Sequence, residues 1–535
     1  MVTNPSTTFR FSIPDLQTGC EILARIPQAN PGQAIDEVNV FLDSLLDFPP
    51  GSADYFQLLE NARSTVAQVA TELSRLYLDK ALPLGESEEI CFQKVLAAWL
   101  KMAKAYAHCA QLDDQDAPDV RTATFLFRCI HYTGMAIVEH QRARREYPWG
   151  LWLDLHGYYA SAEEWGVATL PLAGNPDAPE LRNTHCLAAY VSFLLGEMAG
   201  CYSLPASEQA LVRRWAVLWA PLVGLHRVSP GAELPRQLVD LMHDAALRPR
   251  QDCLKTEYIR RLDTARLMLQ IKQVKEQLRR QVSPSRLALG DDCSAGECLA
   301  LLNLLTNPWT QTQNERRFRR RAASGITRVC SGFDEMYYYI VGKPFELPES
   351  KNVYSRHEYE TLFAFRYQEN PQQTLQIHQS QLKFSVDTWE VLNESANGFR
   401  LMRNTGGRKM LHGQIIGLSP QDGGAFMLAR VAWLMQENGG GLISGIETLP
   451  GIPQAASVRM TEVGSEQDDK YHPAFLLPAT PTSPEPTLVL PSGWYRPGRI
   501  LELFVDKTWR IQLSHVVDDG PDFEQVGFTL CPPAP

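Results

Sequence analysis

The spacing of apolar residues changes near residue 310, and this change constrains the fold more than any other feature of the chain. Before it, apolar side chains recur at intervals of three and four, as on one face of an amphipathic helix. After it, short segments alternate between apolar and polar residues, which is typical of strands. A chain of 535 residues has room for two to four domains. We therefore expect a multidomain α+β protein with an all-α N-terminal half followed by β-rich domains.

The N-terminal half consists mainly of helix-length amphipathic segments. Helices are expected at 53–76, 88–112, 121–144, 180–199, 206–223, 234–246, 254–282 and 296–305. Large and small side chains in 151–166 are spaced as in the first helix of a tetratricopeptide repeat, so the half is helical-repeat-like, although no regular period is found. Residues 1–50 carry several prolines and little periodicity. We expect an extended N-terminal arm over 1–50 and an α-helical domain over 51–310.

Two short polar motifs in the C-terminal half precede a series of strand-like segments. An arginine run reads Arg-Arg-x-x-x-Arg over 316–321, and the motif Asn-x-Ser-x-x-Gly covers 393–398 directly after the extended segment 388–392. Strand candidates then follow at 399–402, 411–418, 426–434 and 441–447. These segments indicate a β-rich domain that begins near the two motifs.

These residues resemble the PilZ domain, a small β-barrel that binds the bacterial second messenger cyclic di-GMP, and the resemblance covers roughly 316–450. In that family the arginine motif lies on a loop that enters the barrel, and the second motif lies at a strand end. The resemblance implies a ligand site formed by Arg316, Arg317, Arg321, Asn393, Ser395 and Gly398. The family often has Asp where this chain has Asn393.

The chemistry of the proposed ligand suits these residue types. Guanidinium groups give charge-assisted hydrogen bonds to phosphate, match the O6/N7 edge of guanine and stack on the base. Asn393 and Ser395 stand at i and i+2, which puts both on one face of a strand. Gly398 allows a positive φ and a close approach to the ligand.

The domain boundaries follow from these segments. A PilZ-like barrel is expected over 311–450. About seventy positions separate Arg321 from Asn393, which is more than a compact PilZ domain needs. We expect an insertion at about 337–387, or else a rearranged barrel. Strand candidates at 455–460, 474–477, 487–490, 499–505 and 510–517 predict a second β-rich domain over 451–535, either separate or sharing the first sheet.

Composition excludes several classes of function. The net charge of −10 argues against general nucleic-acid binding, which needs a basic surface. No stretch has the length of a membrane span, and no signal peptide is recognised at the N-terminus. Eleven scattered cysteines favour reduced thiols and a cytoplasmic location. Cys293 and Cys298 lack a second pair, so we interpret them as structural and expect no metal.

Two functions remain in view. The first is a cyclic di-GMP receptor whose helical half passes the signal to a protein partner, plausibly in motility or surface attachment, as the resemblance implies. The alternative is a PilZ-like scaffold without ligand, in which the inserted segment covers the site. An enzyme is not expected, because nucleophile-elbow, zinc-protease, Walker and Rossmann motifs are missing and His357, beside Glu358 and Glu360, fits a solvated loop. No catalytic residue and no cofactor are predicted.

Overall fold

The computed structural model describes residues 11–113, 119–173, 183–228, 234–253, 257–312, 320–347, 384–404, 406–420, 425–461, 470–481 and 483–531. The chain divides into two compact units. The first is formed by 1–80 and 84–315, and the second by 81–83 and 316–535.

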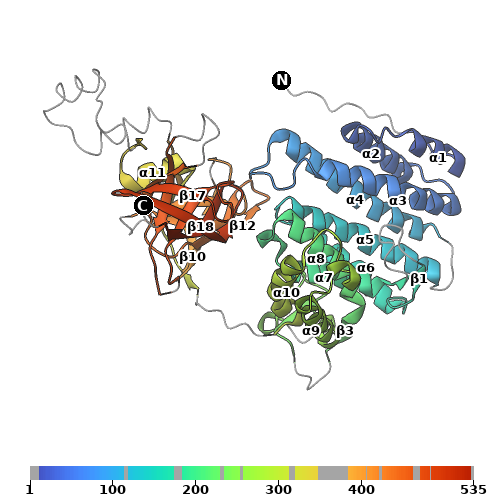
Figure 1. The fold of residues 1–535 in the computed structure, drawn as a ribbon. Coiled ribbons are helices and arrows are strands. Elements are labelled where there is room, and N and C mark those ends of the chain that lie inside the picture. Colours follow the sequence, from blue (N-terminus) through green and yellow to red (C-terminus); the bar gives the residue numbers. More distant parts are fainter. Residues whose placement is uncertain are drawn as a thin grey trace. The chain divides into compact units, whose positions relative to one another are not determined.

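The first unit is mainly helical (Figure 1). Its α-helices are α1 (Leu16–Arg25), α2 (Pro31–Asp47), α3 (Ser52–Ser74), α4 (Glu86–Gln111), α5 (Val120–Arg142), α6 (Leu151–Glu164), α7 (Cys186–Met198), α8 (Ala206–Trp219), α9 (Ala265–Arg279) and α10 (Ala295–Thr310). Short 3-10 turns are η1 (Cys201–Ser203), η2 (Ala220–Leu222), η3 (Arg250–Asp252) and η4 (Pro284–Leu287).

Successive helices pack side by side and bury one continuous apolar core. Helix α4 packs against α2, α3 and α5, and α5 in turn packs against α6 and α7. One buried polar cluster in this array is centred on Glu60. Arg128 of α5 donates to both oxygens of Glu60 on α3 at 2.9 and 3.0 Å, and Tyr106 donates to the same carboxylate at 2.7 Å. This arrangement satisfies buried groups that would otherwise destabilise the core.

The predicted extended arm over 1–50 is wrong for most of its length, because α1 and α2 occupy 16–25 and 31–47. Each helix begins at a capping residue: Asp15 accepts from the Thr18 amide at 2.8 Å, and Asn30 accepts from the Gln33 amide at 3.3 Å. Pro31 is the first residue of α2. One of the prolines that favoured an extended arm therefore starts a helix, where its missing N–H costs nothing.

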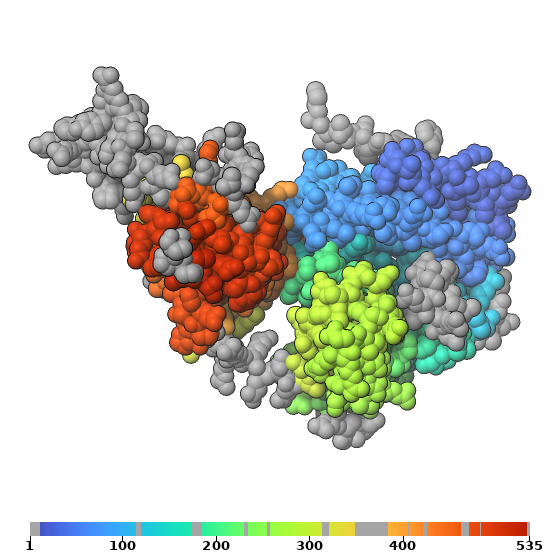
Figure 2. Space-filling model, viewed as in Figure 1, coloured from blue at the N-terminus to red at the C-terminus, as the bar shows by residue number. Residues whose placement is uncertain are grey.

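The helical unit also contains small sheets, which the sequence reading missed. Strands β3 (Gly224–Arg227), β6 (Ile259–Asp263), β4 (Gln237–Asp240) and β5 (Arg248–Pro249) form an antiparallel sheet in that order. Strands β1 (Leu172–Ala173) and β2 (Asn183–Thr184) form a separate two-stranded sheet. The helix expected at 234–246 is wrong, and the one expected at 254–282 begins only at 265. A short apolar run fits the helical period and the strand period equally well, and its pairing with distant segments determines which structure it adopts. In Figure 2 this part of the unit and α9–α10, in yellow-green, cover one side of the helices.

The second unit contains two β-barrels. Strands of the first are β7 (Arg321–Ala322), β8 (Ile326–Ser331), β9 (Asp387–Ser395), β10 (Gly398–Arg403), β11 (Ile415–Pro420), β12 (Met427–Gln436) and β13 (Leu442–Thr448). The order is β10-β13-β12-β11-β8-β9-β7, and β10 also pairs with β9. Six strands therefore close a ring, and β7 extends from β9. The four strand candidates after Gly398 are confirmed as β10 to β13.

The second barrel is a separate closed sheet. Its strands are β14 (Gln454–Met460), β15 (His472–Leu477), β16 (Thr487–Pro491), β17 (Ile500–Phe504), β18 (Thr508–Asp519) and β19 (Phe523–Leu530). They close in the order β14-β15-β16-β19-β18-β17. The expectation of a further β-rich domain is confirmed, but the two barrels do not share a sheet. Figure 2 shows residues of the second barrel, in red, exposed on the face toward the viewer.

Helix α11 (Phe333–Val341) joins the cores of the two barrels. Its Phe333 ring stacks on Phe475 of β15 at 5.6 Å, and its Tyr339 ring stacks on Phe426, before β12, at 5.2 Å. The insertion expected at about 337–387 is therefore wrong at its start, because residues up to 341 belong to this packed helix. Residues 348–383 of that prediction lie outside the described part of the chain.

Candidate functional site

The two sequence motifs lie on neighbouring strands of the first barrel. Strand β7 pairs antiparallel with the end of β9, so that Arg321 stands opposite Glu394 and Ala322 opposite Asn393. Arg316 and Arg317 lie outside the described residues. The described end of the arginine run is thus beside the Asn-x-Ser-x-x-Gly motif, although about seventy positions separate them in the sequence.

Residues Asn393 and Ser395 lie on the same face of β9. Their partners on β10 are Arg400 and Gly398, and the alternation between these pairs is regular. Ser395 and Gly398 form the last pair before a two-residue turn, and the Ser395 hydroxyl donates to the Gly398 carbonyl at 3.2 Å. The motif therefore presents an amide and a hydroxyl at the end of a tight hairpin.

Gly398 has a different reason to be glycine from the one the sequence predicted. Its φ is not in the left-handed region, so the expected positive φ is wrong. A Cβ at this position would lie 2.0 Å from the carbonyl oxygen of Ile446 on β13. The glycine lets two strands approach closely, which fixes the position of the hairpin within the barrel wall.

The register assigns the arginines to opposite faces of β7. Arg321 shares the face of Glu394, where its charge suits a cross-strand pair. If the antiparallel register of β7 and β9 is extended by one residue, Arg320 stands opposite Ser395. Both arginines are exposed. Arg320, which the sequence analysis left out of the site, is therefore the described member of the arginine run that shares the face of Asn393 and Ser395.

A row of residues extends this face across the barrel. Asn393 pairs with Arg400 on β10, Arg400 pairs with Gly445 on β13, and Gly445 pairs with Trp433 on β12. A Cβ on Gly445 would lie 1.8 Å from Trp433 Nε1, so the indole lies over this glycine. The Arg400 guanidinium carbon is 5.6 Å from the centroid of the same indole ring. Asn393, Arg400 and Trp433 thus form one continuous surface.

Arg400 and Trp433 were missed by sequence reasoning. The Arg400 Nε is buried without a hydrogen-bond partner, which leaves a donor unused beside Asn393. Arg400 could have been found from the sequence, because residues two apart on a strand share a face and Gly398 belongs to the motif. Trp433 could not, because its position depends on the pairing of β12 with β13. The face combines guanidinium groups, an amide, a hydroxyl and an indole ring, which can bind phosphate and stack on a purine base.

Two further arginines of the first barrel, Arg403 and Arg408, pair with carboxylates. Arg403 is buried, donates to Asp387 and to the Arg408 carbonyl, and stacks on Trp389 at 4.8 Å. Arg408 pairs with Glu335 of α11 at 2.5 Å. Burial lowers the pKa of Arg403, and Asp387 opposes that shift. These arginines hold the barrel together and are distinct from Arg400.

The described residues contain no helix long and apolar enough to cross a membrane. Within the same residues, no group of three or more histidine, cysteine or acidic side chains could hold a metal ion. Cys293 and Cys298 are free thiols whose sulfur atoms are 3.0 Å apart.

The helical half, the first barrel and its polar face define a PilZ-type protein with a helical N-terminal region. Comparison with known families agrees with this class. Residues 19–231 match the family described as "Cyclic-di-GMP receptor FimW, N-terminal domain", and residues 456–531 match "FimW C-terminal beta-barrel domain". Together these two matches cover more than half of the chain, and both models describe parts of the same receptor.

A curated relative supports the same assignment. The chain is 26% identical over 514 residues to "Cyclic-di-GMP receptor FimW" of Pseudomonas aeruginosa. The similarity covers 88% of this chain and 82% of the relative. It therefore spans both units, including the first barrel, which lies between the two family matches.

Proposed function

We propose that this protein is a cyclic di-GMP receptor that binds its ligand on the outer face of the first barrel. The observation that carries the proposal is the pairing of β7 with β9, since it brings the arginine run to the strand motif. The printed name of the Pseudomonas relative agrees with it, because that protein is described as a receptor for the same messenger.

In the proposed complex, the arginines bind the phosphates and the strand motif binds a guanine. Arg316, Arg317 and Arg321, as the PilZ resemblance implies, and Arg320, from the register, would supply guanidinium groups. Asn393 and Ser395 would bind one edge of a base, and Gly398 would hold their hairpin against β13. Arg400 and Trp433 would offer a planar surface on which a base stacks.

Charge explains why an anionic ligand would be stabilised here although the whole chain is acidic. Five arginines occur within 316–321, and their like charges repel one another. Two ligand phosphates would offset that repulsion locally. We propose that ligand binding orders this segment and so changes the surface that it presents to a protein partner. Motility or surface attachment is the proposed context.

Calorimetric titration of cyclic di-GMP against single variants tests the site. Arg320→Ala, Arg321→Ala and Ser395→Ala are each expected to weaken binding at least about tenfold, since a hydrogen bond to a charged group contributes roughly 1.5–3 kcal/mol. Arg510→Ala and Ser514→Ala, exposed positions on β18, serve as matched controls and should bind as the unchanged protein does. Equal affinity in all five variants would remove the proposed residues from the site.

The proposal also covers catalysis, location and partner. We propose that it is a binding protein without catalytic residues or cofactor, that it acts in the cytoplasm, and that it uses a protein rather than nucleic acid as its partner. The scaffold alternative predicts no ligand at all. Unfolding in the presence of cyclic di-GMP separates the two, because a ligand at a hundred times its Kd adds about 2.7 kcal/mol of stability.

A further inference from the structure

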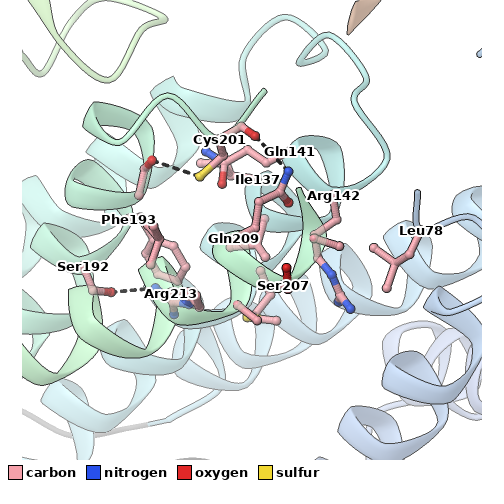
Figure 3. Close-up of a pocket in the computed structure, with 16 residues that line it drawn as sticks. Leu78, Ile137, Gln141, Arg142, Ser192, Phe193, Cys201, Ser207, Gln209 and Arg213 are labelled. Atoms are coloured by element: carbon pink, nitrogen blue, oxygen red, sulfur yellow. Dashed lines mark hydrogen bonds between the residues drawn. The ribbon is translucent and has the colours of Figure 1, made fainter. Parts of the chain in front are cut away.

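The helical unit contains a cavity far along the sequence from the barrel motifs. Its volume is about 470 Å³, and it lies between α5, α7, η1 and the start of α8, with Leu78 completing one side (Figure 3). Cavities of this size hold small organic ligands in other proteins. Sixteen residues line it, and all of them belong to the first unit.

Most of the cavity wall is apolar. Apolar side chains come from three helices and the 3-10 turn: Met135, Ile137, Val138, Phe193, Cys201, Ala206, Ala210 and Val212. The Phe193 ring is seated against Gly134 of α5, where an added Cβ would lie 2.1 Å from it. This close packing fixes the position of the Phe193 ring, which lies between the apolar wall and Arg213. Binding of a hydrocarbon or aromatic group there would be favourable, because apolar surface would be removed from water.

A single guanidinium group without a counter-ion faces this wall. Arg213 of α8 donates to the Ser192 hydroxyl at 2.9 Å, and its guanidinium carbon is 4.1 Å from the Phe193 ring centroid. Among the described residues, no carboxylate forms an ion pair with it, and none of the residues lining the cavity is acidic. Desolvation lowers the pKa of Arg213 to about 10, so the group remains charged at neutral pH.

The other arginine that lines the cavity has a counter-ion, and the nearby Glu197 carboxyl accepts hydrogen bonds from neutral groups. Arg142 pairs with Glu139 at 2.9 Å, and Glu197 accepts from Gln141 at 3.0 Å and from Tyr147 at 2.5 Å. In contrast, Gln209 Oε1 is buried without a donor, while its amide nitrogen donates to the carbonyls of Cys201 and Leu204. The cavity therefore has one cation and one acceptor to spare.

We propose that this cavity binds a small amphipathic carboxylate, with its anionic head on Arg213 and its apolar body against Phe193, Met135 and Val138. A guanidinium group forms a planar, often bidentate pair with a carboxylate, and the apolar wall excludes the water that would weaken the pair. The head group would supply the negative charge that the lining lacks. A donor on the ligand, such as a hydroxyl, would satisfy Gln209 Oε1.

Titration of the full chain with decanoate and with decanol, followed by calorimetry, tests the site. The unchanged protein is expected to bind decanoate at least about tenfold more tightly than decanol, because only the carboxylate pairs with Arg213. Arg213→Met should reduce that preference to about one, with decanol binding retained. Arg214→Met is the matched control: the neighbouring arginine pairs with Asp292 and does not line the cavity, so the preference should persist.

A variant that fills the cavity distinguishes this site from general binding to the surface. Ala210 lines the cavity from an exposed helical position, so Ala210→Phe should fold and abolish binding of both probes. Circular dichroism and cyclic di-GMP titration of each variant establish that it is folded and that the barrel site is unaffected. The proposal is overturned if the unchanged protein binds neither probe, if Arg213→Met keeps the decanoate preference, or if folded Ala210→Phe binds decanoate normally.

Discussion

Two sets of arginine side chains differ in whether they form an ion pair. Arg128, Arg260 and Arg403 are buried and each pairs with a carboxylate, so they contribute to the cores. Arg213 and Arg400 contact aromatic rings but form no ion pair within the described residues. A partly desolvated cation without a counter-ion is costly unless a ligand supplies the anion. Arg213 and Arg400 lie where we propose ligands, whereas the buried Arg144 and Arg499 donate to backbone carbonyls instead.

Replacement of Arg400 tests its contribution at the barrel face. Arg400→Met should weaken cyclic di-GMP binding about tenfold or more, because the side chain keeps its apolar length but loses its charge and its planar stack on Trp433. The affinity of Arg400→Lys should lie between those of the unchanged protein and Arg400→Met, since lysine retains the charge but not the planar group. Calorimetry gives the affinities, and Arg459→Met, which removes a pair with Glu502 in the second barrel, is the control.

A buried histidine gives the helical unit a predictable response to acid. His156 is inaccessible to solvent, its Nε2 lies 3.1 Å from the Ala245 carbonyl and its Nδ1 2.7 Å from the Tyr190 hydroxyl, which suits a neutral ring. Burial lowers its pKa to about 4 from an ordinary value of about 6.5. The unfolded chain therefore binds a proton first as the pH falls, and stability is lost between about pH 6.5 and pH 4.

The size of this effect can be measured by comparison with His156→Gln, which keeps a donor and an acceptor but does not titrate. Denaturant unfolding at pH 7.5 and pH 4 should show that the unchanged protein loses about 3 kcal/mol more than the variant between these pH values. At pH 7.5 His156 is neutral in both states and contributes no pH dependence. Parallel losses in the two proteins would contradict the depressed pKa.

At the scale of elements, strand β7 is the shortest part of the first barrel and the one on which the proposed site depends most. It consists of two residues, pairs only with β9 and closes no part of the ring. Its removal should therefore cost little stability. It does, however, fix where the arginine run approaches Asn393 and Ser395.

Ala322→Pro is expected to detach β7, because proline removes a backbone donor and fits poorly in a paired strand. Cyclic di-GMP affinity should fall at least about tenfold, while the melting temperature changes little. Ala322→Val, which favours a strand, should bind normally. A large loss of melting temperature in the proline variant would instead show that β7 supports the whole barrel.

Most elements whose apolar residues follow one clear period were predicted from the sequence. The long helices α3, α4 and α5 and strands β10 to β13 were expected, because each has a regular apolar face. Elements such as β4, β6 and β19 could not be found in the same way, since their short apolar runs acquire a structure only by pairing with distant segments. The same limit applies to the site: Asn393 and Ser395 are local, whereas Trp433 reaches Arg400 only through the register of four strands.

At the scale of the whole molecule, the two proposed ligand sites lie in different units of the chain. A ligand stabilises the unit that binds it. In scanning calorimetry, cyclic di-GMP should raise the melting of the barrel unit, and decanoate that of the helical unit. The unit concerned can be recognised by Arg400→Met and Arg213→Met, each of which should cancel one shift and leave the other. A single shift common to both ligands and insensitive to both variants would contradict separate sites.

The two barrels share apolar side chains through α11, and their strands also exchange polar contacts. Asp522, before β19, accepts from the Ile415 amide at 3.0 Å, and Asp518 on β18 pairs with Arg430 on β12 at 2.9 Å. Phe475 and Phe523 of the second barrel are fully buried in the cluster that contains Met336 and Leu428.

This common cluster restricts how genes for such proteins can be shortened or recombined. A chain that stopped at residue 450 would expose the aromatic side of α11 to water and would be prone to aggregate. Exchange of one barrel alone between distant homologues would mismatch rings that now touch. The messenger-binding barrel is therefore expected to be inherited together with the barrel that follows it, even where the latter contacts no nucleotide.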